Sequence, residues 1–418
     1  MTTAAAQQAL SVAERLADPA TVVAAARDST GISLAHGLAG TALLHARLSG
    51  TDPRFAAAAT DHWTAAAAHA RKSGVASVGV FGDGGGLASS LIIGSGYLPD
   101  PEPHLPTIRR AARWLSAGAV GLARRHQVRR QNGDSALAWA VYDSINGLSG
   151  IGRVLLAAHA AGHPHAEPGL LASLHTLTEL INTSQGAKPG WWLPAHRHPS
   201  GVRVHPSGAA TTGLAHGIAG PLAFLAIASR AGLQVDGQAA AIRRAADWLT
   251  RWRVGTTYRW PPYITGDQLD GEAAPPVPGR ADAWCYGTPG IGRALISAGE
   301  ALRDPELVAV GHAALDSLSH QPSDRWDVEG PTLCHGASGV LQCAAVGAPG
   351  VAVLAADLVT TAYDPRHRFG FQHHHRGVIT DEPDLLTGAA GVALALADHS
   401  KLPGLSTSTR WDALLLLS

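Results

Sequence analysis

The stretch that decides the fold is Asn146-Gly147-Leu148-Ser149-Gly150-Ile151-Gly152-Arg153-Val154-Leu155-Leu156-Ala157-Ala158, in which a Gly-x-x-Gly turn leads into an apolar segment. A helix that is apolar almost all round is buried on most of its sides. The same turn recurs along the chain, with its first glycine at Gly37, Gly82, Gly147, Gly217, Gly287, Gly336 and Gly388. Self-similarity of this kind predicts a repeat fold that grows by stacking units.

The segments between these turns are more polar and amphipathic, as at residues 108–122 and 239–252. Their one-sided apolar stripes predict outer helices, and the apolar helices that follow the turns predict inner ones. Seven such pairs can close into a ring. The glycines allow tight turns and close approach of the helices. In such a ring all seven turns and helix N-termini would lie at one end and face a common mouth.

Three insertions rich in Pro, Gly, Trp and His interrupt the helical pattern, at about residues 161–212, 254–283 and 363–384. We expect loops or short strands there that overhang the mouth. Because the repeats, between about residues 36 and 391, continue on both sides of each insertion, we expect a single domain over residues 1–418.

Composition excludes several classes of protein. Charged residues make up 15% of the 418 residues and the formal net charge is zero, so the chain lacks the basic footprint of a nucleic-acid binder. No apolar run approaches the ~18 residues that span a bilayer, and the N-terminus lacks the pattern of a signal peptide. Three cysteines argue against a disulfide framework and favour a reducing compartment, for which we expect the cytoplasm.

Two of the three cysteines stand in related contexts, Trp284-Cys285-Tyr286-Gly287 and Cys334-His335-Gly336. Two thiolates and one imidazole are a three-ligand zinc set with an open fourth position. Thiolates weaken the Lewis acidity of zinc, which suits the metal to binding another thiol and keeping it nucleophilic. The pattern therefore favours a substrate sulfur in the fourth position, with a closed structural site as the alternative.

The chain resembles the lanthionine synthetase C family, the lanthipeptide cyclases, from about residue 36 to 391. The motifs that carry the resemblance are residues 142–150, 213–220, 284–287 and 334–336. The resemblance implies an all-α fold, an α/α toroid of seven inner and seven outer helices. It also implies a zinc enzyme that adds Cys thiols of a dehydrated precursor peptide (leader plus core) across dehydroalanine or dehydrobutyrine, forming (methyl)lanthionine rings.

The resemblance also assigns roles to individual residues. One Zn2+ per chain would be bound by Cys285, Cys334 and His335, and the reacting atoms would be surrounded by His216, Asp143, Tyr286 and Arg280. The arginine departs from the family spacing, because Ala281 stands four residues before the zinc cysteine and Arg280 stands five before it.

The chemistry agrees with the role of His216. Addition of a thiolate to an unsaturated amide leaves an enolate that needs a proton, and a histidine near neutral pKa is suited to deliver it. Asp143 would orient His216 or the thiol, or cap its own turn. We interpret His36 as structural and Cys343 as a core side chain. The histidine run 373–375 invites a second metal site, but we expect solvated loop side chains.

Two other functions remain open from the sequence. The same fold and zinc set would serve an enzyme that adds a small thiol such as glutathione to dehydroamino acids, and only the substrate separates the two. A non-catalytic scaffold that holds the peptide for a partner dehydratase is the second, although such a scaffold has no need of His216. Since the repeats fill most of the chain, we expect a stand-alone cyclase served by a separate dehydratase.

Overall fold

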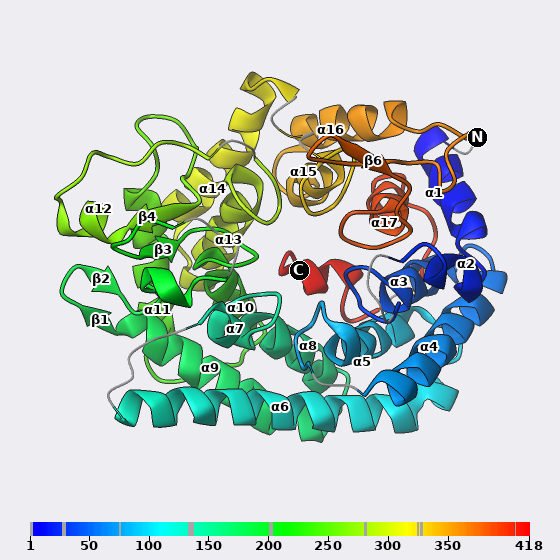
Figure 1. The fold of residues 1–418 in the computed structure, drawn as a ribbon, viewed down its shortest axis with the longest axis horizontal. Helices are drawn as coiled ribbons and strands as arrows, with labels where there is room; N and C mark the ends of the chain where they lie inside the picture. The colour runs from blue at the N-terminus through cyan, green and yellow to red at the C-terminus, as the bar shows by residue number, and fades with distance from the viewer. Residues whose placement is uncertain are drawn as a thin grey trace.

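The helices form two concentric rings, as the view in Figure 1 shows. The computed structural model describes residues 3–26, 31–74, 77–132, 138–199, 204–279, 282–323, 326, 329–405 and 407–418. Within this part of the chain, the inner ring consists of α3 (Leu38–Leu48), α5 (Asp83–Gly94), α8 (Leu148–Ala160), α10 (Ala219–Arg230), α13 (Thr288–Leu302), α15 (Ala337–Ala344) and α17 (Ala389–His399). Each inner helix contacts the next, and α17 contacts α3, so the ring closes.

The outer helices cover the inner ring one by one. Over the same described ranges they are α1 (Ala4–Arg15), α4 (Arg54–Ser73), α6 (Leu105–Gln131), α9 (Glu167–Asn182), α11 (Gln238–Arg251), α14 (Pro305–Ser317) and α16 (Pro349–Thr361). The N-terminal helix α1 covers the last inner helix, α17, and so completes the outer ring. The predicted α/α toroid of seven inner and seven outer helices is confirmed.

The burial of the two rings follows their sequences. Every residue of α3 is buried, as its apolar composition predicts. In α11 the buried residues form one stripe that includes Ala241, Ile242, Ala245 and Leu249, while the opposite face is polar. The predicted outer segments 108–122 and 239–252 correspond to α6 and α11. No helix in the described ranges is long and apolar enough to cross a bilayer.

The glycine turns are joined to one another by backbone hydrogen bonds at the mouth of the inner ring. The amide of Ala35 donates to Phe81, and that of Phe81 donates to Ile145. Four further bonds are Ser144 N to Ala215 O, Ala215 N to Cys285 O, Cys334 N to Leu386 O and Leu386 N to Ala35 O, at 2.9 to 3.2 Å. These bonds link six of the seven junctions. At the remaining junction, between the fifth and sixth turns, two cysteine side chains meet.

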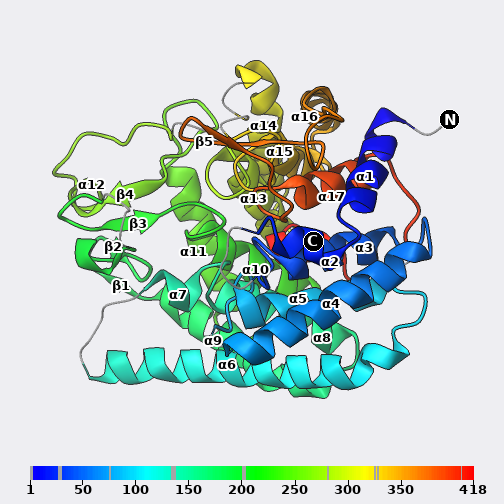
Figure 2. The ribbon, with the colours of Figure 1, turned by 45° about the vertical axis from the view of Figure 1, so that its right-hand side comes forward.

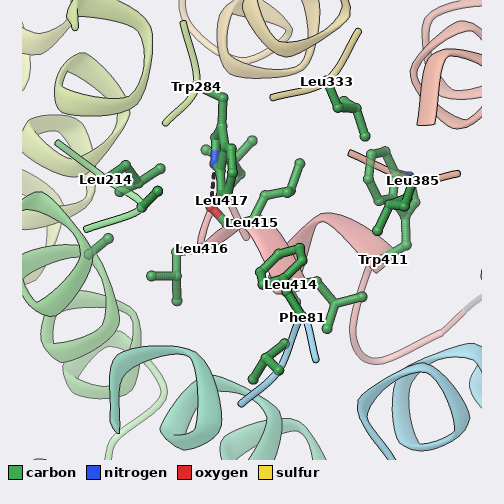
Figure 3. Close-up of a cluster of buried hydrophobic side chains, with 14 of the residues drawn as sticks. Phe81, Leu214, Trp284, Leu333, Leu385, Trp411, Leu414, Leu415, Leu416 and Leu417 are labelled. Atoms are coloured by element: carbon green, nitrogen blue, oxygen red, sulfur yellow. Dashed lines mark hydrogen bonds between the residues drawn. The ribbon is translucent and has the colours of Figure 1, made fainter. Parts of the chain in front are cut away.

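The C-terminal segment fills the axis of the ring. This segment comprises the 3₁₀ helix Trp411–Leu415 and the residues after it. Figure 3 shows its apolar side chains packed among those of the turns, including Phe81 and Trp284; the labelled ones are Trp411, Leu414, Leu415, Leu416 and Leu417. Trp284 Nε1 donates to Leu415 O at 2.9 Å. Two buried arginines of inner helices, Arg293 and Arg153, donate to Leu417 O and Ser418 O. The ring therefore has a packed core in place of a channel.

The insertions carry three antiparallel strand pairs. They are β1 (Ser184–Gln185) with β2 (Lys188–Pro189), β3 (Ala209–Thr211) with β4 (Tyr263–Thr265), and β5 (His373–His375) with β6 (Val378–Thr380). Figure 2 shows β1 to β4 together at the left edge of the molecule. The short helices α2 (Pro19–Val23), α7 (Trp139–Tyr142) and α12 (Gly266–Asp270) complete the described regular structure, apart from 3₁₀ turns.

One expectation about the insertions was wrong. Residues 161–212 do not break the helical pattern throughout, because α9 occupies Glu167–Asn182 within them. Leu170, Leu174, Leu177 and Ile181 recur at three- and four-residue spacing and are buried, so an apolar stripe outweighs the nearby Pro and Gly. The expectation of a single domain over residues 1–418 stays a prediction.

Candidate metal centre

The candidate ligands come from two neighbouring turns. Cys285 precedes α13, and Cys334 and His335 precede α15, which contacts α13 in the inner ring. The Sγ atoms of both cysteines and one nitrogen of His335 lie within 4.8 Å of one another. Cys285 is almost fifty positions from Cys334 and His335 in sequence, and the ring brings the three residues together.

The donor set fits zinc. Tetrahedral zinc with bonds of about 2.3 Å to sulfur and 2.0–2.1 Å to nitrogen has ligand atoms about 3.4–3.8 Å apart, which the cluster accommodates. A hydrogen bond from the Cys334 thiol lowers the pKa of Cys285 well below its ordinary value. The negative charge on Cys285 raises the pKa of His335 to about 11. Because the Cys285 thiolate attracts positive charge, the cluster suits a divalent cation.

The backbone around Cys285 depends on two glycines. Gly287, the N-cap residue immediately before α13, has a φ of 98°, a conformation that side-chain-bearing residues rarely adopt. Gly213 lies against the same turn, since a Cβ there would be 2.5 Å from Cys285 O and 2.5 Å from Tyr286 Cδ1. These two positions let the Cys285 turn approach its neighbour closely.

A carboxylate stands behind the candidate histidine ligand. Oε2 of Glu329 lies 3.2 Å from Nδ1 of His335. Burial opposes ionisation of Glu329, but the nearby imidazoles of His335 and His373 outweigh it and hold the pKa of the carboxyl well below its ordinary range. Carboxylates commonly orient metal-binding histidines in this way.

His216 faces the same pocket and is paired with Asp143. Nδ1 of His216 lies 2.7 Å from Oδ2 of Asp143, whose side chain is 1% exposed. The other oxygen of Asp143 accepts a hydrogen bond from Asn146 N at 2.7 Å, so Asp143 both caps its turn and contacts His216. Trp139 stacks on the imidazole, with ring centroids 4.7 Å apart and planes at 14°. The His216 ring is thus held by its edge and by one face.

Two pockets meet at His216 and Tyr286. The first, of about 310 Å³, is lined by His216, Tyr286 and all three candidate ligands. The second, of about 340 Å³, is lined by His216, Tyr286, Trp139 and Tyr263, among others. Burial raises the pKa of Tyr286 well above its ordinary value, so its phenol stays protonated at neutral pH.

Comparison with known proteins identifies the family to which the chain belongs. The family model described as lanthionine synthetase C-like protein matches residues 28–416. The chain belongs to the lanthionine synthetase C-like family. The match to nisin biosynthesis protein NisC of Lactococcus lactis subsp. lactis is 26% identical over 206 residues, which span 48% of each chain. The alignment therefore covers about half the length of this curated relative.

The fold of this chain also matches that of a solved structure. The structure titled nisin cyclase superposes with a TM-score of 0.76 at 20% identity, covering 94% of this chain and 93% of the other. At this identity the likeness establishes the fold.

Most residues that the family resemblance singled out are brought together. His216 and Tyr286 line the same pocket as the three candidate ligands, and Asp143 contacts His216. Arg280 lies outside the described residues. Sequence reasoning missed Glu329 and Trp139, which no local motif marks. It also left His36 as structural, although His36 lies on the wall of the first pocket, 3.2 Å from Oδ2 of Asp384.

Proposed function

We propose that this chain is a zinc-dependent lanthipeptide cyclase. Its reaction would add Cys thiols of a dehydrated precursor peptide to dehydroalanine or dehydrobutyrine and form (methyl)lanthionine thioether rings. The observation that carries the proposal is the placement of two cysteines and a histidine on the same pocket as His216, whose imidazole is held by the buried Asp143. Membership of the family supports the same conclusion.

Cys285, Cys334 and His335 would hold the metal. When bound, zinc supplies positive charge that lowers the pKa of a coordinated thiol and keeps its sulfur nucleophilic at neutral pH. Cys334 is partly exposed and the His335 side chain is 44% exposed, so the ligand set opens toward the pocket. This opening is where the peptide thiol would enter.

His216 would transfer the proton. The sulfur forms a bond to Cβ of the dehydro residue, the π electrons move onto the amide as an enolate, and Cα then takes a proton. With Nδ1 of His216 held by Asp143, Nε2 is the nitrogen left for the reacting atoms. The buried Asp143 stabilises the imidazolium, and the protonated Tyr286 stands beside it as a hydrogen-bond donor. The proton lost by the thiol balances the one gained by Cα.

The second pocket would receive neighbouring parts of the peptide. Its aromatic lining of Trp139, Tyr263 and Tyr286 adjoins the proton-transferring histidine. Such a surface suits residues that flank the reacting pair. Arg280 remains a proposed active-site residue on the strength of the family resemblance. We also propose that a separate dehydratase supplies the substrate and that the reaction takes place in the cytoplasm.

The test uses the purified zinc-loaded chain and a dehydrated, Cys-containing precursor. Cyclisation adds no mass, so remaining free thiols are counted by alkylation and mass spectrometry. We expect peptide thiols to disappear with the wild-type chain and to persist with Cys334→Ala. Cys343→Ala is the matched control, because Cys343 is buried in α15 outside the pocket and its loss should leave cyclisation intact.

The same assay separates the rival functions. Adding glutathione distinguishes an intermolecular thiol transferase, which would give a peptide heavier by one glutathione for each dehydro residue consumed. Equal alkylation with the wild-type chain and Cys334→Ala, using a cognate precursor, would contradict the proposed reaction and favour a scaffold.

A further inference from the structure

A second cluster of metal-ligating side chains lies next to the first. His373 and His375 alternate along strand β5, so both point to the same side of the β5–β6 hairpin. Their rings stack with centroids 5.9 Å apart. Nε2 of His373 lies 3.2 Å from Oε2 of Glu329, and Nδ1 of His375 lies 2.6 Å from Oε1. The expectation of solvated loop histidines was wrong for His373, which lies on a strand and is 2% exposed, whereas His374 is exposed and the His375 side chain is 43% exposed.

The backbone fixes this arrangement on both sides. His374 N donates to Glu329 O at 3.2 Å, which ties β5 to the segment that leads to Cys334. Gly330 has a φ of 83°, and a Cβ there would lie 2.7 Å from Gln372 O. The hairpin turn places Arg376 and Gly377 at positive φ, 50° and 82°. The donors are therefore presented by two segments held in register.

The donor set has the chemistry of a transition-metal site. Two histidines and one carboxylate, with a fourth position open, is a known zinc ligand set. One ligand atom from each residue lies within 4.8 Å of the other two. Tetrahedral bonds of about 2.1 Å place ligand atoms about 3.4 Å apart. The 3.2 Å between His373 Nε2 and Glu329 Oε2 is close to this distance. His375 Nδ1 is nearer to the carboxylate, at 2.6 Å, but its side chain is 43% exposed and a small rotation would bring it to the same distance.

We propose that Glu329, His373 and His375 form a second metal site, for Zn2+ or a similar first-row divalent cation. Imidazole ligands disfavour Ca2+ and Mg2+, which prefer sets made of oxygen. Glu329 also faces Nδ1 of His335, so one carboxylate joins the two clusters. The proposal goes beyond the cyclisation reaction and does not depend on it, because it is tested by counting bound metal.

The test is metal stoichiometry of the full chain. The protein is stripped with a chelator, reloaded with Zn2+, passed through gel filtration and analysed by mass spectrometry of the metal. We expect two zinc ions per wild-type chain and one per His375→Ala chain. His374→Ala is the matched control, because this neighbour is exposed on the other side of the strand and should keep two ions.

Cobalt identifies which site is lost. Thiolate-to-cobalt charge-transfer bands should persist in His375→Ala and vanish in the double variant Cys285→Ala/Cys334→Ala, which should still bind one ion. One ion per wild-type chain would overturn the proposal and leave Glu329 as a hydrogen-bonding partner only. Two ions in His375→Ala, as in His374→Ala, would also overturn it. Neither result bears on cyclisation, which the alkylation assay tests separately.

Discussion

The contact between His216 and Asp143 makes a quantitative prediction. Asn replaces Asp143 with a side chain of the same shape and removes its charge, while the hydrogen bond to Asn146 N is kept. A charged hydrogen bond such as the 2.7 Å contact to His216 is worth about 1.5–3 kcal/mol. At about 1.36 kcal/mol per factor of ten, Asp143→Asn should lower kcat by about 10- to 150-fold. The amide can also hold the other histidine tautomer, which adds to the loss.

The assay is the rate at which alkylatable peptide thiols disappear under saturating precursor. Asp384→Asn is the matched control, because Asp384 is equally buried, contacts His36 at 3.2 Å and accepts from Thr387 N at 2.7 Å. It should stay within about threefold of the wild-type rate. A similar loss in both variants would refute the reasoning, as would a full rate in Asp143→Asn. In a His216→Gln background the Asp143 substitution should have little further effect.

Three other predictions concern stability. Burial lowers the pKa of His45 to about 3 and that of His62 to about 4, so the unfolded chain takes up these protons first as pH falls below 6.5. The free energy of unfolding should therefore fall between pH 6.5 and 4 by up to about 1.4 kcal/mol per pH unit for each histidine. Urea titrations at several pH values should show that this free energy depends less steeply on pH in His45→Leu than in the wild type. The same dependence on pH in both would contradict the reasoning. Gly287→Ala should cost about 1–3 kcal/mol because of the positive φ, and an unchanged urea midpoint would refute the strain argument. Deleting residues 416–418 removes one carbonyl acceptor from each of two buried arginines, Arg293 and Arg153, and should cost about 3–6 kcal/mol in the same titration. A cost below about 1 kcal/mol would mean that solvent replaces those acceptors.

The ring was predictable because its cause is local. Each Gly-x-x-Gly turn and the apolar helix after it can be recognised in a short stretch of sequence, and six of the seven first glycines immediately precede an inner helix. The order of the turns then places Cys285 beside Cys334. Seven outer helices were expected, but the sequence did not indicate that the last inner helix, α17, would be covered by α1 from the other end of the chain.

Features that depend on contacts between residues far apart in the chain could not be predicted from the sequence. The plug formed by residues 411–418 has no repeat pattern, and its burial depends on closure of the ring. Glu329 meets His373 and His375 across more than forty positions. A signal did exist: histidines two apart before Arg376-Gly377 fit one face of a hairpin strand. Nothing in the sequence indicated which carboxylate would face them.

The most direct test of the account is removal and restoration of metal. The chelator-stripped chain, and the same chain reloaded with zinc, are incubated with the dehydrated precursor, and free peptide thiols are counted. The account predicts that thiols persist with the stripped chain and disappear after reloading, and that reloading has no effect on Cys285→Ala. Equal loss of thiols with the stripped and reloaded chains, or none with either, would contradict a zinc-dependent cyclase.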